Sequence, residues 1–228
     1  MSNKIVGGIV LASHAVEDYL AMIYKISFEG EKPTTTTIAE NMGISKASVT
    51  DMFKKMAKST LIIHKPYKGI KLTKAGEKIA LEVIRHHRLV ELYLKEAMGV
   101  SWDKVHDEAD KWEHILSEDI EDRIVEMLGN PTHDPHGAPI PTKDGHIQDE
   151  KFTPLSEARE GEKLLVRMVE DSDPEKLRYL ADKGIYPQTV IKVKEVQPFE
   201  GPLTLDVEGK PQIIGHEVSR IVFVSLKT

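Results

Sequence analysis

A stretch rich in proline, residues 130–154, constrains the fold of this chain more than any other feature. It holds five of the 12 prolines in the 228-residue sequence. Proline lacks a backbone donor and is excluded from the interior of helices and of central strands, so the stretch is predicted to be an irregular connector. Before it, apolar residues recur at helical spacing, and after it come short alternating runs. The sequence therefore predicts a mainly helical N-terminal part and a small C-terminal β domain of barrel type.

Apolar periodicity and capping residues divide the helical part into separate helices and one hairpin. Helices are predicted over residues 13–28, 37–41, 46–58, 74–98, 102–116 and 118–128. Ser45 and Ser101 are the expected N-caps of the third and fifth helices, and Asp103 favours the dipole of the fifth. Strands are predicted over residues 61–64 and 70–72, which would pair as a hairpin, and over residues 190–196, 203–207 and 221–223.

The segment Ile38–Thr50 has the spacing of a helix-turn-helix motif. Ala39 is small enough for the two helices to approach, Gly43 takes the turn, and Ile44 and Val49 are expected to fill the space between the helices. Small hydroxyls and lysines on the second helix suit contacts with phosphates and base edges in a major groove. The expected outward residues are Ser48, Thr50, Asp51, Lys54 and Lys55, and the hairpin adds His64, Lys65, Lys68 and Lys71. The alternative is a motif that serves only packing.

The charge of the chain is unevenly divided. The formal net charge is −6, but residues 1–78 carry 12 lysines, no arginine and 7 acidic residues, a net of +5. Residues 79–228 carry the other 19 basic and 30 acidic residues, a net of −11. This asymmetry favours a polyanion as the partner of the N-terminal part, with ordinary surface variation as the alternative.

Histidines and carboxylates gather in the second third of the chain, where seven of the ten histidines lie between His86 and His146. One predicted helix has His106, Asp110, Glu113 and His114 on a single face, and the helix before it has His87 and Glu91 four residues apart. Carboxylates in such a group repel one another, and a divalent cation reverses the sign of that interaction. The pattern indicates a metal site, with a solvated charged face as the alternative. Weaker candidates are His133, Asp134 and His136 in the connector, and His86 is expected at the surface or in an interface.

Two absences narrow the function further. The chain has no Cys, which excludes disulfides, thiolate metal sites and a cysteine nucleophile. The longest apolar run, Ile5–Ala12, is far shorter than the roughly 20 residues of a membrane span. We therefore expect a cytoplasmic protein that has no membrane anchor. The sequence also has no recognisable nucleophile or phosphate-binding loop that would indicate an enzyme.

Several segments of the chain, in order along nearly its whole length, carry a family resemblance. They are Val16–Tyr24, His86–Glu91, Val105–His114 and Pro135–Pro141. Through them the chain resembles the diphtheria toxin repressor family of metal-dependent transcriptional regulators. The resemblance implies a winged helix-turn-helix DNA-binding domain over residues 1–74, a helical metal-binding and dimerisation domain over residues 75–150 and an SH3-like domain over residues 151–228. It also implies a homodimer that binds a palindromic double-stranded DNA operator and represses genes of metal-ion uptake.

The resemblance implies two metal sites and a set of DNA contacts. The primary metal site falls on Asp18, Asp110, Glu113 and His114. The second site falls on His87, Glu91, His106, Asp134 and His136, with Glu175 from the third domain and Asp173 as the alternative to Glu175. The DNA contacts fall on Ser45, Ala47, Ser48, Thr50 and Asp51, to which the charge pattern adds Lys54 and Lys68. The predicted helix over residues 118–128 is expected to build the dimer surface.

Asp18 and Asp110 stand where iron-type members of the family have Met and Cys. Hard oxygen ligands suit Mn²⁺, so Mn²⁺ is the expected cofactor and Fe²⁺ the alternative. Asp51 differs from the Gln of the toxin repressor, so base preference does not carry over. Two other interpretations stay open at the level of sequence. One is a metallohydrolase that uses the same cluster, and the other is a C-terminal domain that binds a peptide or a metal transporter.

Overall fold

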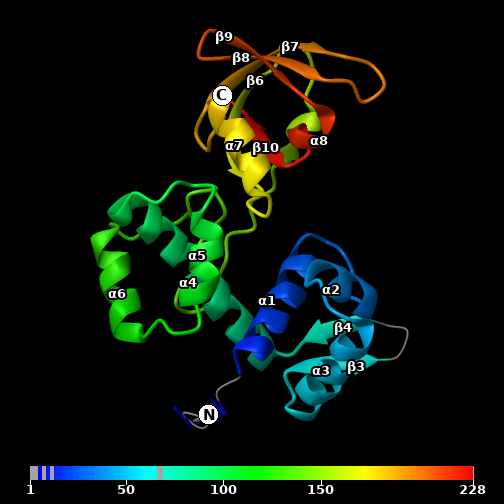
Figure 1. Ribbon diagram of the computed structural model, residues 1–228, viewed down its shortest axis with the longest axis vertical. Helices are drawn as coiled ribbons and strands as arrows, with labels where there is room; N and C mark the ends of the chain where they lie inside the picture. Colours follow the sequence, from blue (N-terminus) through cyan, green and yellow to red (C-terminus); the bar gives the residue numbers. More distant parts are fainter. Residues whose placement is uncertain (1–4, 7–8, 11–12, 66–68, 228) are drawn as a thin grey trace. The chain divides into compact units, whose positions relative to one another are not determined.

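The computed structural model describes residues 5–6, 9–10, 13–65 and 69–227, which form two compact units (Figure 1). The first unit comprises the chain up to residue 86 together with residues 141–146, and the second comprises residues 87–140 and 147 onward. The boundary falls inside one long helix, α4 (Lys74–Met98). None of the helices in the described part of the chain is long and apolar enough to cross a bilayer.

The first unit contains short helices and two small hairpins, with a helix-turn-helix followed by a wing. Its elements besides the start of α4 are β1 (Ile5–Val6), β2 (Ile9–Val10), α1 (His14–Phe28), α2 (Thr35–Asn41), α3 (Lys46–Lys58), β3 (Ile62–Lys65) and β4 (Gly69–Leu72). The two strands of the wing, β3 and β4, pair antiparallel. The predicted α3 and wing are confirmed, and the Ser45 hydroxyl caps α3 by accepting from the Ser48 backbone N–H at 3.1 Å.

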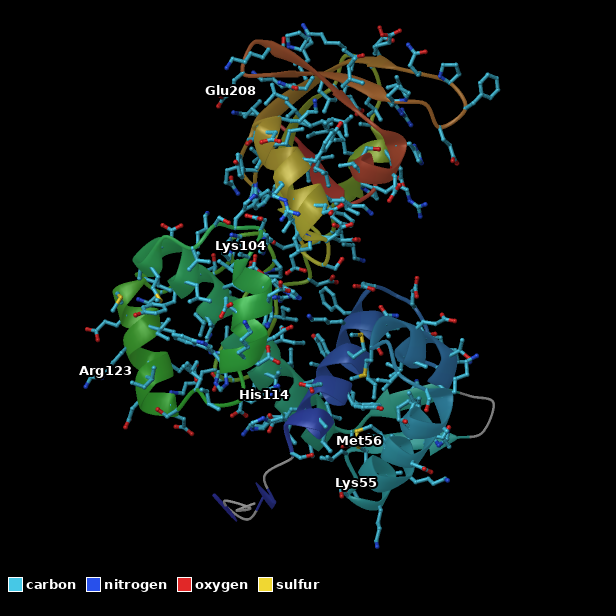
Figure 2. The ribbon with its side chains drawn as sticks, in the orientation of Figure 1. Lys55, Met56, Lys104, His114, Arg123 and Glu208 are labelled. Atoms are coloured by element: carbon cyan, nitrogen blue, oxygen red, sulfur yellow. The ribbon has the colours of Figure 1, made fainter. Side chains whose placement is uncertain are left out.

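The core of the first unit lies between α1, α2 and α3. Val49, Phe53 and Met56 project into it from one face of α3, while Lys55 on the opposite face is exposed, as Figure 2 shows for Met56 and Lys55. Gly43 adopts a φ of +64° at the end of α2, as the turn requires. The expectation for Ile44 is wrong. Its side chain is 37% exposed, because the space between the helices is filled by Val49 and its neighbours.

The helical part of the second unit consists of the end of α4, α5 (Val105–Trp112) and α6 (Glu118–Met127). The predicted start of α5 is wrong by three residues. Ser101 does not cap it, because its hydroxyl donates to the Asp103 carboxylate instead. Asp103 also lies before the helix, where it accepts from Arg178 Nη1 at 3.0 Å. Ser101 is therefore engaged by Asp103, and Asp103 by the C-terminal domain, in place of the capping that the sequence predicts.

The C-terminal part of the second unit is a six-stranded antiparallel sheet with the strand order β5-β10-β6-β7-β8-β9 (Figure 1). Its elements are β5 (Thr153–Pro154), the 3₁₀ turn η1 (Leu155–Glu157), β6 (Lys163–Val169), α7 (Pro174–Asp182), β7 (Val190–Val196), β8 (Leu203–Val207), β9 (Lys210–Ile214), α8 (His216–Ser219) and β10 (Val222–Leu226). Alternating residues of these strands form an apolar core, to which Trp102 from the helical part also belongs. The predicted fold class, helical domains followed by an SH3-like β domain, is confirmed.

The connector between α6 and β5 is irregular, as the prolines predicted, but it is closely packed. Asp134 organises a turn in which its Oδ1 accepts the backbone N–H groups of His136 at 2.8 Å and Ala138 at 3.0 Å. The next glycine, Gly137, has a φ of +89° and lies so near β6 that a Cβ would stand 2.0 Å from the Arg167 carbonyl oxygen. His136 in turn accepts the Val169 N–H at 2.9 Å through its own carbonyl. The connector is thereby fixed against the end of β6.

Candidate metal centre

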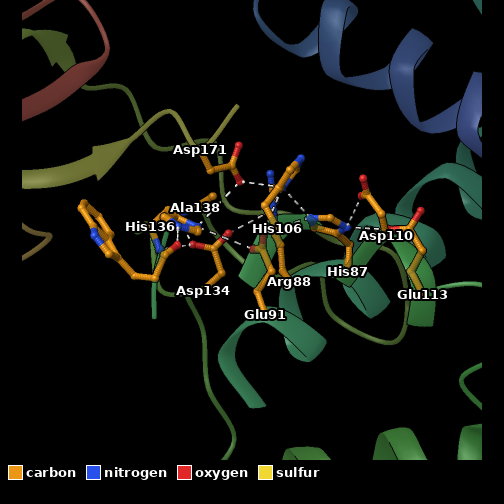
Figure 3. A network of polar contacts seen from close by, with 11 residues as sticks. His87, Arg88, Glu91, His106, Asp110, Glu113, Asp134, His136, Ala138 and Asp171 are labelled. Carbon is orange, nitrogen blue, oxygen red and sulfur yellow. Dashed lines mark hydrogen bonds and ion pairs between the residues drawn. The ribbon is translucent and has the colours of Figure 1, made fainter. Parts of the chain in front are cut away.

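Helix α4, the helix α5, the connector and the loop after β6 bring acidic and imidazole side chains together in the second unit (Figure 3). His87 and Glu91 lie one turn apart on α4, so they share a face. His106 and Asp110 come from α5, and Glu113 and His114 follow its last residue. The candidates form two groups. We call Glu91, Asp134, His136 and Asp171 the connector cluster, and Asp110, Glu113 and His114 the helix cluster.

Glu91, Asp134 and His136 of the connector cluster are buried and Asp171 is half-buried, and one ligand atom from each lies within 4.8 Å of the others. His136 Nδ1 lies 3.8 Å from Glu91 Oε2 and 3.7 Å from Asp171 Oδ2. Arg88 borders the cluster, with its Nε 3.6 Å from Asp134 Oδ2. These separations exceed hydrogen-bond distance, so His136 Nδ1 makes no direct hydrogen bond to Glu91 or Asp171.

Three buried polar atoms of this cluster lack a hydrogen-bond partner among the described residues: Glu91 Oε2, Asp134 Oδ2 and His136 Nδ1. Buried polar groups are nearly always satisfied, and each orphan costs free energy. All three are atoms that ligate divalent cations. The residues present therefore fit a metal ion, because a single cation at this point would satisfy all three at once.

His106 and His87 extend the connector cluster toward α5. His106 Nδ1 lies 3.1 Å from Glu91 Oε1 and 3.5 Å from Asp171 Oδ2. His87 Nε2 lies 3.0 Å from Glu91 Oε1 and 3.0 Å from His106 Nδ1. His87, Glu91, His106 and Asp171 also form a group whose ligand atoms are close enough together to hold one metal ion.

His87 also contacts the helix cluster through its other nitrogen. Its Nδ1 lies 2.5 Å from Glu113 Oε2 and 3.4 Å from Asp110 Oδ1. His114 Nε2 lies 3.2 Å from Glu113 Oε1. The side chain of Asp110 is 59% exposed, whereas that of Glu113 is 10% exposed. The imidazole of His87 therefore joins the two clusters into one continuous polar network.

Charge balance within the network shifts several pKa values. Burial by itself raises the pKa of Glu91, but the charge of His87 and hydrogen bonds from the surrounding histidines lower it well below its usual value. Neighbouring Asp171 and Glu91 raise the pKa of His106 to about 10. Burial opposes protonation of His136, yet Glu91 raises its pKa to about 9. Without metal, both imidazoles are therefore cations that neutralise the buried carboxylates.

The other carboxylates of the connector cluster respond in opposite directions. Burial and the charge of Glu91 raise the pKa of Asp134 to about 6. Burial also raises the pKa of Asp171, but the interaction with His106 outweighs it and lowers the value to about 2. A cluster of perturbed, mutually dependent carboxylates and imidazoles is typical of a functional site.

The third-domain residue of this network differs from the expectation. Asp171 joins the connector cluster, and Glu175 does not, because Glu175 is exposed in the first turn of α7. The alternative, Asp173, is occupied as the N-cap of α7, where its Oδ1 accepts the Glu175 N–H at 2.9 Å. An Asp-Pro pair is a typical start of a helix, so the sequence held a reason to set Asp173 aside. His86 is buried, at 8% exposure, and not at the surface.

The remaining expected site residues lie in the first unit. Asp18 is half-buried on α1. Ser45, Ala47, Ser48, Asp51 and Lys54 are exposed at and after the start of α3, and Thr50 is half-buried there. Asp51 and Lys54 form an exposed ion pair at 2.9 Å. Lys68 lies outside the described residues.

Comparisons with known proteins identify the family of this chain. Residues 12–70 match the iron dependent repressor N-terminal DNA binding domain, and residues 73–142 match the iron dependent repressor metal binding and dimerisation domain. Residues 153–226 match the FeoA domain. The iron-dependent repressor IdeR of Mycobacterium tuberculosis is 32% identical over 221 residues, which cover 91% of this chain and 95% of that protein. The chain belongs to the diphtheria toxin repressor family.

Further similar proteins support this family assignment. The diphtheria toxin repressor of Corynebacterium diphtheriae is 36% identical over 128 residues, covering 56% of this chain and 57% of that protein. Among solved structures, a manganese-dependent transcriptional repressor in complex with manganese has a TM-score of 0.86 and 32% identity, covering 93% of this chain and 100% of that one. ScaR with bound Zn²⁺ has a TM-score of 0.79 and 29% identity, covering 93% and 99%.

The family settles the class of function. The chain is a DNA-binding transcriptional repressor that depends on a divalent metal, and it is not an enzyme. The alternative interpretation of the cluster as a metallohydrolase is therefore wrong.

Proposed function

We propose that this repressor responds to Mn²⁺, binds a palindromic operator as a homodimer and controls genes of metal-ion uptake. The observation that carries the choice of metal is the donor set. Every candidate ligand is a carboxylate or an imidazole, and the chain has no Cys. Such ligands suit Mn²⁺, which binds most weakly in the divalent series and gains nothing from thiolate. The similar repressor with a TM-score of 0.86 is a complex with manganese, which supports the same choice.

Fe²⁺ is the second candidate for the metal. A site of oxygen and nitrogen donors also accepts Fe²⁺, and IdeR, 32% identical, is named an iron-dependent repressor. Both ions are divalent and hard enough for this donor set, so only direct comparison separates them.

We infer two metal sites. The first uses Asp18, Asp110, Glu113 and His114, and the second uses Glu91, Asp134, His136 and Asp171, with His87 and His106 beside them. Asp171 takes the role first expected of Glu175, since its Oδ2 lies 3.7 Å from His136 Nδ1. The three orphaned atoms of the connector cluster support the second site. A bound cation would supply the positive charge that compensates these carboxylates.

The switch rests on the division of the first site between two parts of the chain. Asp18 belongs to α1 of the DNA-binding domain, whereas Asp110, Glu113 and His114 belong to the helical domain. Ligands shared in this way tether the DNA-binding domain in one orientation. In a two-fold dimer the recognition helices must be about 34 Å apart to reach successive major grooves, so selecting an orientation selects DNA affinity.

The proposed dimer interface and the proposed DNA-binding surface both consist mainly of exposed residues. Ile115, Ile120 and Met127, around α6, are 71%, 49% and 64% exposed, and an apolar surface of this kind fits a subunit interface. DNA contacts would come from the N-cap residue Ser45, from Ala47, Ser48, Thr50, Asp51 and Lys54 on α3, and from Lys68, which lies outside the described residues. The same proposal divides the chain into a DNA-binding domain over residues 1–74, a metal-binding and dimerisation domain over residues 75–150 and an SH3-like domain over residues 151–228.

Selection from a random DNA library tests this function, with Mn²⁺, anaerobic Fe²⁺, Zn²⁺ and chelator in parallel. We expect one palindrome to be enriched with Mn²⁺ and not with chelator. If the palindrome is enriched at a lower free concentration of Fe²⁺ than of Mn²⁺, Fe²⁺ would replace Mn²⁺ as the assigned metal. Equal enrichment with chelator would overturn the switch.

A further inference from the structure

Trp102 lies where the C-terminal sheet domain meets the connector cluster. It precedes α5 in the helical part, yet its indole is 6% exposed and belongs to the apolar core of the sheet domain. Its ring lies 4.8 Å from that of Tyr186, measured between centroids. The indole also stacks on the His136 imidazole, with centroids 5.5 Å apart and planes 29° apart. Trp102 thus contacts both the sheet domain and a candidate ligand.

The backbone of Trp102 also determines which His136 nitrogen can bind a metal. His136 Nε2–H donates to the Trp102 carbonyl oxygen at 2.8 Å. A carbonyl can only accept, so Nε2 carries a proton, and the lone pair of the neutral imidazole lies on Nδ1. Nδ1 is the orphaned atom that faces Glu91 and Asp171. A carbonyl partner on the distal nitrogen is how proteins orient a ligating histidine.

The neighbours of Trp102 hold the same segment against the sheet domain. Asp103 is paired with Arg178 of α7 at 3.0 Å, and Ser101 donates to Asp103. The indole Nε1–H is buried with no acceptor in the described part of the chain. A ring held in place despite an unsatisfied donor indicates that its position serves more than its own hydrogen bonding.

We propose that Trp102 is a positioning residue of the metal centre, which links the seating of the C-terminal sheet domain to the orientation of the His136 ring. The inference rests on the proposed metal site and adds the element that couples it to the third domain. When the sheet domain is seated, the Trp102 ring contacts both Tyr186 and His136, and Asp171 reaches the cluster from the loop after β6. Loss of either contact leaves the His136 ring free to rotate and weakens metal binding.

Fluorescence provides the first test, because the chain has only two tryptophans. Trp112→Phe leaves Trp102 as the single emitter. We expect Mn²⁺ to quench its emission in step with the disappearance of free Mn²⁺ from the electron paramagnetic resonance spectrum. Binding of Mn²⁺ to the full set of sites without a change in emission would overturn the inference while leaving metal-dependent DNA binding intact. Absence of any Mn²⁺ binding would overturn the proposed function as well.

Substitution provides the second test. Trp102→Ala is expected to weaken Mn²⁺ binding about 10- to 100-fold, and Trp102→Phe, which keeps an aromatic ring, should recover most of it. Leu205→Ala is the matched control, since it truncates a buried residue of the same core on β8. It should lower the melting temperature without changing Mn²⁺ affinity. Equal loss of affinity in Leu205→Ala and Trp102→Ala would reduce Trp102 to a purely structural residue.

Discussion

At the scale of single residues, Glu91 explains why this centre can exist without a metal. Its carboxyl group is fully buried, at 0% exposure, and an isolated buried carboxylate would carry a large desolvation cost. His87 and His106 contact one oxygen at 3.0 and 3.1 Å, and His136 lies 3.8 Å from the other. Protonated imidazoles therefore take the place of a divalent cation, and metal binding is an exchange of protons for metal.

Metal loading should accordingly release protons. The pKa values of His106 and His136 are about 10 and about 9, above their ordinary value of 6.5, so both are charged at neutral pH. Ligation needs a neutral His136 nitrogen, and a bound cation repels the charge of the adjacent His106, hence Mn²⁺ binding at pH 7 should release about two protons, and affinity should rise as the pH rises toward 9. Calorimetry in buffers of different ionisation enthalpy measures the number of protons released per Mn²⁺ bound. His106→Asn should lower it by about one, and a heat independent of the buffer would contradict the exchange.

Single residues also show where a sequence pattern predicts the candidate metal ligands and where it does not. Helical spacing selects His87 and Glu91 on α4 and His106 and Asp110 on α5, because each helix fixes which of its residues share a face, and the same spacing extends to Glu113 just after α5. Asp171 was missed, since it lies in a loop after β6 whose course depends on the packing of β6 against the connector. Glu175 rests on a loose match to the family, and in the structure it is exposed in the first turn of a capped helix.

At the scale of elements, the connector turn packs closely against β6 because residue 137 is a glycine. Gly137 has φ +89°, and a Cβ there would stand 2.0 Å from the Arg167 carbonyl oxygen. Gly137→Ala should therefore move Asp134 and His136 and abolish the high-affinity Mn²⁺ site as well as lowering the melting temperature. Gly129→Ala is the control, with φ +73° and nothing within 4 Å. It should cost only about 1 kcal/mol of backbone strain and bind Mn²⁺ normally, as titration monitored by paramagnetic resonance can check.

Helix α3 is the second element whose role can be tested alone. Ser48 lies in its first turn and is exposed, so Ser48→Glu would set a carboxylate against DNA phosphates. We expect operator binding to fall by about 100-fold or more, with Mn²⁺ affinity unchanged. Ser59→Glu adds the same charge at the exposed C-cap of α3 and should retain operator binding. Electrophoretic mobility-shift assays measure operator binding by both variants. If Ser48→Glu binds the operator as well as Ser59→Glu does, α3 does not form the DNA interface.

Element boundaries show what local sequence can determine. The limits of α3 and α4 were predicted to the residue, because apolar spacing and caps agree with the packing there. The start of α5 differs from the prediction, since the Ser101 hydroxyl bonds to Asp103, while Trp102 and Asp103 contact the C-terminal domain. Their partners, such as Arg178, lie far along the chain, and no local pattern specifies them. Tertiary contacts overrode the capping preference.

At the scale of the whole molecule, charge and ligand distribution assign different tasks to the two ends of the chain. The N-terminal 78 residues carry a net charge of +5 and the remainder −11, so DNA attracts one end while cations are attracted to the other. In a metal sensor, metal binding at one end must change DNA binding at the other. Asp18 is the proposed ligand that belongs to the DNA-binding domain, whereas the connector cluster lies entirely within the second unit.

Reciprocal coupling tests this communication. If Mn²⁺ raises operator affinity by a factor, operator DNA must raise Mn²⁺ affinity by the same factor. We expect a factor of about 5 to 150, a coupling of roughly 1–3 kcal/mol. Asp18→Asn should reduce both factors together and leave Mn²⁺ binding by the connector cluster intact, since no ligand of that cluster is changed. Mn²⁺ titrations with and without operator, set beside operator titrations with Mn²⁺ and with chelator, measure all four affinities. An Asp18→Asn variant with undiminished coupling would shift the link between metal and DNA from α1 to another part of the molecule.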